Sequence, residues 1–368
     1  MKKVLCAILA LALLAVPAMA LSATAATAEA ANPESDFLYD ILKGEAYVEA
    51  YVGTAGRVVI PDTLGGAPVK VIYNFGAPKH VTSVVLPDTV REIGQYAFTN
   101  CSSLAEINLP EGLRSIGISA FSGCEALRSV RIPSTTSEIG FSAFGIWELT
   151  ELTVAEGNPY LYSEGNCIIE RSTKTLVHGC STSVIPDGVK TIRCCAFSGV
   201  GLKEAVIPDS VRTIEESAFW AAMELEKVTL GSGVQTIGEE AFFGCHELSE
   251  IHIPASVQTV GKKAFDFCIK MTDIYCDAPF RTGGWDANWL GDCTARVHWN
   301  EDAAVMGDLN ASGAIDSLDY MLLKRHCLNT FKLTEGQETV ADVNGDNIIN
   351  AADYMLVKRH VLGTFKIG

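Results

Sequence analysis

The chain has 368 residues, of which 48% are apolar and 20% charged, and this balance excludes a largely disordered protein. Its 28 basic and 44 acidic side chains give a formal net charge of −16. Because phosphate groups repel so acidic a chain, we expect no nucleic-acid partner.

The first twenty residues have the pattern of an export signal. Lys2 and Lys3 form a basic head, residues 4–16 are an apolar stretch too short to span a bilayer comfortably, and Ala18-Met19-Ala20 is a small-residue cleavage site. We predict a signal peptide over 1–20 and a flexible leader over 21–34. No later segment approaches about 18 consecutive apolar residues, so the mature protein is expected to be secreted without a membrane span.

The middle of the chain repeats at a nearly constant interval, within the range typical of solenoid proteins. The clearest marker is an Ala-Phe pair, and only the interval between Phe144 and Phe197 is much longer than the others. The pairs are Ala97-Phe98, Ala120-Phe121, Ala143-Phe144, Ala196-Phe197, Ala218-Phe219, Ala241-Phe242 and Ala264-Phe265. In each unit an alternating segment such as 104–109 predicts a strand, and a proline such as Pro110 ends it. Stacked units of this length predict a solenoid with a parallel sheet along one side.

Twelve cysteines in an exported chain raise the question of disulfides, and Cys6 leaves with the signal. Four others follow a repeat phenylalanine at the same short spacing, and we interpret them as small buried side chains stacked in a ladder: Cys101, Cys124, Cys245 and Cys268. Two further pairs stay open as disulfides, because connectivity is not readable from sequence: Cys167 with Cys180 and Cys276 with Cys293.

These units resemble the BspA-like class of bacterial leucine-rich repeats, and Leu248 to Cys268 matches its pattern almost position by position. The resemblance implies an α/β-type solenoid over residues 35–298, with recognition of a protein or glycan ligand. Residues 155–184 interrupt the period and predict a projecting hairpin, which either carries binding specificity or is a structural decoration. Trp285 and Trp289 form either a sugar platform or, in the interpretation we favour, packing of the C-terminal cap.

Two matching stretches, 308–319 and 342–353, are each twelve positions long and rich in oxygen-bearing side chains. Oxygen donors at loop positions 1, 3, 5, 9 and 12, with a backbone carbonyl at position 7, suit a hard cation and predict two calcium ions. Position 6 requires a sharp turn and holds Gly313 or Asn347, both of which tolerate positive φ. The expected ligands are Asp308, Asn310, Ser312, Ala314, Asp316 and Asp319, then Asp342, Asn344, Asp346, Ile348, Asn350 and Asp353.

A helix is expected behind each loop, since residues 319–326 and 353–360 agree at seven of eight positions. This duplication over 305–368, after a short linker at 299–304, resembles a type I dockerin, a small all-α, EF-hand-like module that binds cohesin domains of cellulosomal scaffold proteins. The resemblance implies cohesin contacts at four positions of each half and two docking orientations. They are Ser317, Leu318, Lys324 and Arg325, then Ala351, Ala352, Lys358 and Arg359.

An enzyme is the main alternative, because dockerins often accompany glycoside hydrolases. Cleavage of a glycosidic bond requires two carboxyl groups at a defined separation in a cleft, and no recurrent motif of that kind is visible. No nucleophile elbow, phosphate loop or zinc-ligand helix appears either. We therefore expect a non-catalytic binding or adhesion protein of a cell-surface cellulosome, with an accessory polysaccharide-degrading component as the alternative.

Overall fold

The computed structural model describes residues 30–281, 283–300 and 303–367. The signal peptide predicted over 1–20, and the leader up to residue 29, lie outside the described residues. The described chain opens with a short 3-10 helix, η1 (Glu34–Asp36), and an antiparallel hairpin of β1 (Phe37–Leu42) and β2 (Glu45–Tyr51). The strand β5 (Ala67–Ile72) pairs with β2 in parallel and with β4 (Thr63–Leu64) in antiparallel fashion. This end of the first sheet caps the solenoid.

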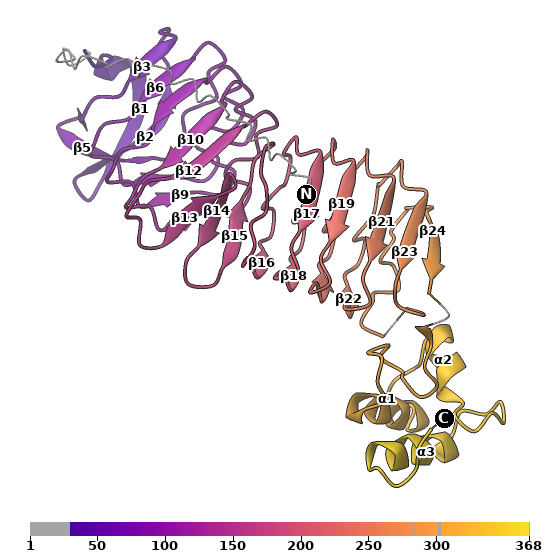
Figure 1. Cartoon of the computed structure of the whole chain (residues 1–368). Helices are drawn as coiled ribbons and strands as arrows, with labels where there is room; N and C mark the ends of the chain where they lie inside the picture. The colour runs from indigo at the N-terminus through magenta and orange to yellow at the C-terminus, as the bar shows by residue number, and fades with distance from the viewer. Residues whose placement is uncertain (1–29, 282, 301–302, 368) are drawn as a thin grey trace, which may run out of the picture. The chain divides into compact units, whose positions relative to one another are not determined.

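Each solenoid turn contributes one longer strand, and these strands pair in parallel with the turns beside them (Figure 1). The pairing forms three sheets in succession, because the ladder is interrupted twice. The strands are β3 (Arg57–Val59), β6 (Ser83–Val85) and β8 (Glu106–Asn108); β10 (Ser129–Ile132) and β12 (Glu151–Val154); and β17 (Glu204–Ile207), β19 (Lys227–Leu230), β21 (Glu250–Ile253), β23 (Asp273–Cys276) and β24 (Arg296–Trp299).

A second row of very short strands lies on another side of the turns, where the sequence predicted no sheet. These strands are β7 (Glu92–Ile93), β9 (Ser115–Ile116) and β11 (Glu138–Ile139), then β16 (Thr191–Ile192), β18 (Thr213–Ile214), β20 (Thr236–Ile237) and β22 (Thr259–Val260). A glycine follows most of them. A Cβ on Gly117 would lie 2.5 Å from the backbone of Gly94 and Gln95 in the preceding turn, so close stacking of turns requires glycine here.

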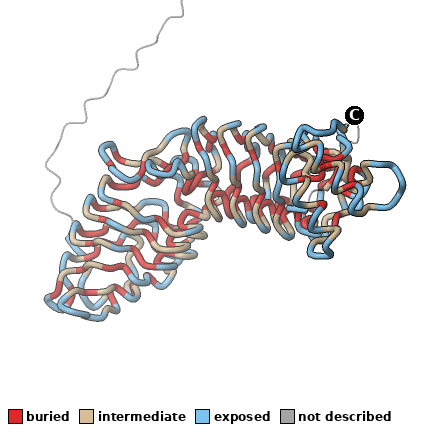
Figure 2. Tube along the Cα trace, turned by 90° about the horizontal axis from the view of Figure 1, so that it is seen from below, coloured by how far each residue is buried: buried red, intermediate tan, exposed pale blue. Residues whose placement is uncertain are grey.

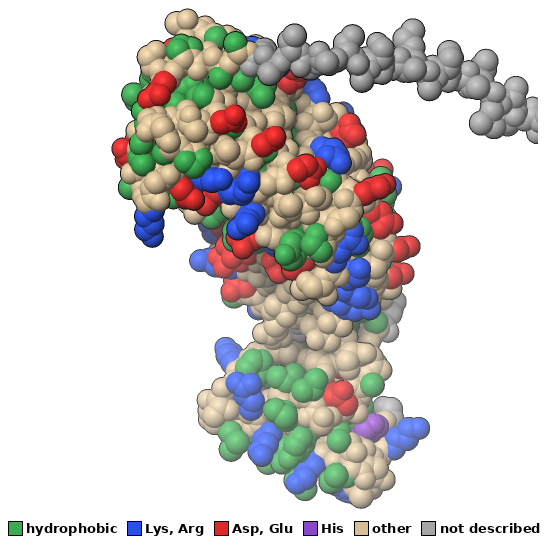
Figure 3. All heavy atoms as spheres, turned by 90° about the vertical axis from the view of Figure 1, so that its left-hand side faces the viewer, with side chains coloured by type: hydrophobic (Ala, Val, Ile, Leu, Met, Phe, Trp, Pro, Cys, Tyr) green, Lys and Arg blue, Asp and Glu red, His purple; other side chains and the backbone are tan. Residues whose placement is uncertain are grey.

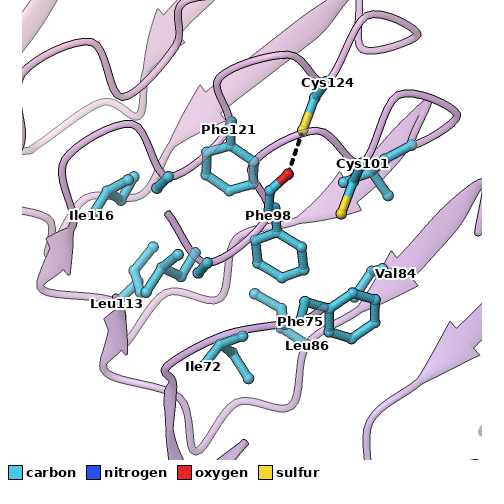
Figure 4. Packing of buried hydrophobic residues seen from close by; sticks show 14 of the residues in the cluster. Ile72, Phe75, Val84, Leu86, Phe98, Cys101, Leu113, Ile116, Phe121 and Cys124 are labelled. Carbon is cyan, nitrogen blue, oxygen red and sulfur yellow. Dashed lines mark hydrogen bonds between the residues drawn. The ribbon is translucent and has the colours of Figure 1, made fainter. Parts of the chain in front are cut away.

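The core is a ladder of fully buried phenylalanines, of which Figure 4 shows Phe75, Phe98 and Phe121. Figure 2 shows that buried residues recur along the solenoid turns. The rings of Phe98 and Phe121 stack at 5.3 Å between centroids, and those of Phe121 and Phe144 at 5.6 Å. The buried cysteine of the repeat lies beside this ladder and uses its thiol. The Sγ of Cys124 donates to the carbonyl of Phe98 at 3.1 Å, and that of Cys268 donates to Phe242 at 3.2 Å. The sequence predicted the burial of these cysteines but not the bond from one turn to the next.

All eleven described cysteines are free thiols, including the two pairs that the sequence left open as disulfides. We expect the four ladder thiols to resist alkylation in the native protein. Burial raises the pKa of Cys101 and of Cys268 to about 12, so the reactive thiolate is scarce at neutral pH. Labelling with iodoacetamide, followed by peptide mapping, checks this. Modification of these four in the folded chain as fast as in urea would contradict it.

The insertion builds three antiparallel strands, β13 (Leu161–Glu164), β14 (Cys167–Glu170) and β15 (Thr175–His178), and β15 then pairs with β16 in parallel. The phenylalanine ladder breaks at this point. His178 meets the ring of Phe144 edge-on at 5.5 Å, and stacking resumes at Phe197 and Phe219. The buried apolar residues of the solenoid accordingly form two clusters, and the insertion contributes to both, with Ile168 in the first and Ile169 in the second.

Two tryptophans close the far end of the ladder. Trp285 and Trp289 are each 5% exposed, and their rings meet at 5.0 Å in a T-shaped arrangement. Trp289 meets Phe265 edge-on at 5.7 Å, and Nε1 of Trp285 donates to the carbonyl of Val257 at 3.2 Å. The burial of both rings supports the packing interpretation and leaves no platform for a sugar here.

Every α-helix of the described residues lies after Val305, so the described solenoid itself is built of strands and turns. The helices are α1 (Ser317–Cys327), α2 (Glu335–Ala341) and α3 (Ala351–Val361). The sequence predicted α1 and α3 but missed α2. Its signal is a capping box, in which Thr334 accepts from the backbone of Gln337 and the Gln337 side chain accepts from that of Thr334.

Candidate calcium loops and docking helices

The first loop folds around two buried aspartates at its ends. Both oxygens of Asp308 accept backbone amides, from Ser312 at 3.1 Å and from Gly313 at 2.7 Å. Asp319, at position 12, accepts amides of Leu309 and Asn310 with one oxygen and of Asp316 with the other. Gly313 has a φ of 84°, the left-handed backbone that position 6 requires. Hydrogen bonds within the loop therefore form the complete turn.

The second loop repeats these bonds at the equivalent positions. Asp342 accepts from Asp346 at 3.1 Å and from Asn347 at 2.7 Å, while Asp353 accepts from Asn344 at 3.2 Å and from Asn350 at 3.0 Å. Asn347 has a φ of 63°, so asparagine takes the place of the glycine at position 6. The same loop geometry is thus reached with a different residue at the turn.

The chemistry of the loops fits a divalent cation. Burial raises the pKa of Asp319 to about 6 although backbone amides oppose the shift, and the charges of Asp308 and Asp316 raise it further. Burial likewise raises the pKa of Asp308. The carboxylates therefore lack a compensating positive charge, which Ca²⁺ would supply. Among the described residues no three His, Cys, Asp or Glu side chains gather closely enough to bind a metal on their own, so amide, hydroxyl and carbonyl oxygens must complete the shell.

Each loop leads directly into its helix through a capping box. Asp316 accepts the amide of Leu318 at the start of α1, and Asn350 accepts that of Ala352 at the start of α3. Ring stacking at 5.1 Å joins Tyr320 of α1 to Tyr354 of α3, and their hydroxyls hydrogen-bond at 2.9 Å. The two halves therefore pack through equivalent residues.

Histidine and arginine at the helix ends also act in pairs. Nδ1 of His326 accepts the amide of Leu333, and Nδ1 of His360 accepts that of Ile367. These bonds give the repeated histidines a structural role in place of metal binding. The guanidinium of Arg325 lies 5.2 Å from the ring centroid of Phe331, and that of Arg359 lies 5.3 Å from Phe365.

The residues expected to contact cohesin lie at the surface of α1 and α3. All are exposed except Lys358, which is half-buried, with Nζ 6.0 Å from the centroids of both Tyr320 and Tyr354. Met321 and Met355 are exposed as well, and sequence reasoning missed them. Their signal is helical spacing, since each lies on the same helix face as an expected contact one turn earlier. Figure 3 shows hydrophobic and basic side chains side by side on this C-terminal module.

The solenoid has a cleft of about 480 Å³ where the insertion interrupts the short strands, lined by residues of β7, β9, β11 and of the three-stranded insertion. Arg193 lines this cleft, and its Nη2 donates to the carbonyls of Ile139 at 3.0 Å and Gly140 at 3.2 Å. Burial, followed by the charge of Arg193, lowers the pKa of His178 to about 3, so its ring is neutral and Nε2 donates to Gly140 at 2.9 Å. These bonds join the two sheets where strand pairing stops.

Comparison with protein families identifies both regions. Residues 72–173 and 174–284 match the BspA type leucine rich repeat region in six copies, and together they cover more than half of the chain. Residues 306–362 match the dockerin type I domain. Only these two kinds of domain are found, and no catalytic domain is among them. No curated protein matches the chain. None of the described helices is long and apolar enough to cross a membrane.

Several solved structures are similar to this chain. A leucine rich cell surface protein from Faecalibacterium prausnitzii is 23% identical, with 77% of this chain and 97% of that chain covered and a TM-score of 0.45. The pneumococcal vaccine antigen PcpA is 18% identical, with coverages of 66% and 80% and a TM-score of 0.50. At 18% identity, the similarity to PcpA concerns the fold alone. The family match shows that the chain belongs to the BspA-type leucine-rich repeat proteins, and that it carries a type I dockerin domain.

Proposed function

We propose that this protein is a non-catalytic recognition protein, secreted and carried into a cellulosome-like complex by calcium-dependent binding of its dockerin to a cohesin. The observation that carries the proposal is the pair of matched loops and helices, in which equivalent side chains of α1 and α3 face solvent. Ser317 and Leu318 stand at one end of α1, with Lys324 and Arg325 near the other. Residues 351, 352, 358 and 359 occupy the equivalent positions on α3, where Lys358 is half-buried over the rings of Tyr320 and Tyr354.

This duplication predicts that either helix can lead in cohesin binding. Reversing charge in one half, as Lys324→Asp with Arg325→Asp, should only weaken binding of the full chain, because the other half still docks. The corresponding pair Lys358→Asp with Arg359→Asp should behave alike. Combining all four should cost about 2–4 kcal/mol, the range of interface hot spots. Surface plasmon resonance against a panel of type I cohesins, with calcium present, measures each variant.

The control is Lys332→Asp with Lys366→Asp, which changes charge in both halves outside the expected contacts. Its affinity should equal that of the parent chain. Loss of binding in one double variant alone would leave a single orientation and reject the two-way arrangement. Full binding by the fourfold variant would move the cohesin face away from these helices.

The solenoid supplies the recognition element of the proposal. Trp220 and Phe243 stack at 5.9 Å, and Phe267 continues the row at 5.2 Å from Phe243. Trp220 and Phe267 are exposed, although the equivalent positions of another turn hold the small residues Ser122 and Gly123, respectively. Trp220 and Phe243 cover one another's faces, which favours contact with an apolar protein surface over stacking on sugar rings.

Binding and turnover assays of the full chain separate these ligand classes. We expect little retention on insoluble plant cell-wall polysaccharides and no release of reducing sugar from them. Retention that the Trp220→Ser variant abolishes would establish a glycan ligand. Sugar release that depends on a carboxylate of the cleft, tested as Glu138→Gln, would revive the accessory polysaccharide-degrading role.

A further inference from the structure

Two adjacent cysteines lie outside the buried ladder. Cys194 and Cys195 follow β16, and their Sγ atoms are 3.4 Å apart, in van der Waals contact. Both residues are partly exposed, whereas the ladder cysteines are at most 2% exposed. Side chains of neighbouring residues on a turn commonly diverge, so sulfur contact here means that both thiols point to the same place.

Packing of the repeat does not account for this pair. The two positions before Ala-Phe are never buried in the seven turns that carry them, and elsewhere they hold residues such as Ser119 or Glu216-Ser217. Cys195 has a φ of 58°, the backbone that Ser217 adopts at 55° in the next turn. Serine therefore fits this place without cost, and the fold gives no reason for cysteine.

Neighbouring residues fix the position of the pair. The amide of Cys194 donates to Oε2 of Glu215 at 2.9 Å, which holds the turn in place. The preceding residue is Arg193, which lines the cleft. Burial, the Cys195 thiol and the carboxylates of Glu216 and Glu215 raise the pKa of Cys194 to about 12, so its thiolate is scarce at neutral pH.

We propose that Cys194 and Cys195 are a redox-sensitive dithiol that closes to a disulfide by exchange with a low-molecular-weight disulfide. One cysteine thiolate attacks the small disulfide and releases one small thiolate. The other cysteine then attacks the mixed disulfide, forms the Sγ–Sγ bond and releases the second small thiolate. The protein loses two electrons and two protons, and the small disulfide gains them as two thiols.

The closed form is expected to reopen easily. Adjacent Cα atoms lie about 3.8 Å apart, below the usual disulfide range of about 4.4–6.8 Å, so the ring is strained. Strained, exposed disulfides are the reducible kind that serves regulation. The pair would therefore respond to the thiol state of the medium without crosslinking distant parts of the fold.

The full chain can be tested directly, because trypsin cleavage after Arg193 and Lys203 yields a peptide with these two cysteines and no other. After oxidised glutathione at mildly alkaline pH, the peptide should be lighter by two hydrogen atoms and should resist alkylation. Dithiothreitol should restore both thiols. In the reduced protein, phenylarsine oxide should bind both sulfurs at once and block their alkylation.

Cys195→Ser and Cys194→Ser should each abolish arsenical binding and the mass loss, and the variants should fold because other turns carry serine or other polar residues here. Cys293→Ser, which removes a partly exposed thiol elsewhere, should leave both results unchanged. Recovery of Cys194 and Cys195 carrying separate glutathione groups would overturn the proposal. Arsenical binding that survives Cys195→Ser would do so as well.

Discussion

Chelation of calcium is expected to unfold residues 305–367 while the solenoid stays folded. A module of this small size buries too little apolar surface to be firmly stable, and its core is small, with Leu309, Leu323 and Val357 among its members. Without the ion the buried carboxylates of Asp308 and Asp319 face each other uncompensated. Because the ion binds only the folded loops, it stabilises by about 4 kcal/mol at a thousandfold excess over Kd.

Hydrogen exchange of the full chain, followed by peptide, measures this region by region. In EDTA the peptides of α1 and α3 should exchange at the rate of an unfolded chain, and those around Phe121 should stay protected. Asp308→Asn with Asp342→Asn should reproduce the effect at limiting calcium, whereas exposed Asp88→Asn should not. Protection of both helices in EDTA would show that the module folds without metal.

Truncation of one ladder ring should destabilise the solenoid severely. Phe121 is fully buried between Phe98 and Phe144, so Phe121→Ala leaves a cavity that the neighbouring turns cannot fill, and it removes two ring contacts. Such truncations cost about 3–5 kcal/mol. Urea unfolding, followed by circular dichroism, should show the loss as a lower transition midpoint.

Tyr73→Ala is the matched control for this variant. It also deletes an aromatic ring, but Tyr73 is 61% exposed, so its free energy of unfolding should change by less than about 0.5 kcal/mol. Equal losses in the two variants would mean that the stacked rings do not dominate solenoid stability.

The repeat and the loops could be predicted from the sequence because both recur at a regular spacing. One Ala-Phe pair in each repeat unit places each Phe on the same side of a turn, and the structure buries them all. Position 6 of the two loops was expected at Gly313 and Asn347, and both have positive φ. Calcium ligation and cohesin contacts at the individual residues stay predictions.

Features that depend on contacts between residues far apart in the chain were not predicted from the sequence. The second row of strands is too short in each turn for a pattern of alternation, and it depends on backbone approach across turns. The stacking of Arg325 on Phe331 joins residues that no rule of spacing connects. The cleft lies where the insertion interrupts the short strands, and the hydrogen bonds of His178 and Arg193 there depend on how residues 155–184 fold.

The break in the phenylalanine ladder at His178 divides the solenoid into two blocks of core. Each turn of a solenoid contacts only the turns beside it, so a weak interface between two turns limits the cooperativity of unfolding. An edge-on histidine replaces ring stacking here, and the insertion strands β14 and β15 contribute buried side chains to both blocks. The two blocks are therefore suited to melt as separate foldons, and strain applied at one end would be absorbed at the insertion before it reached the other.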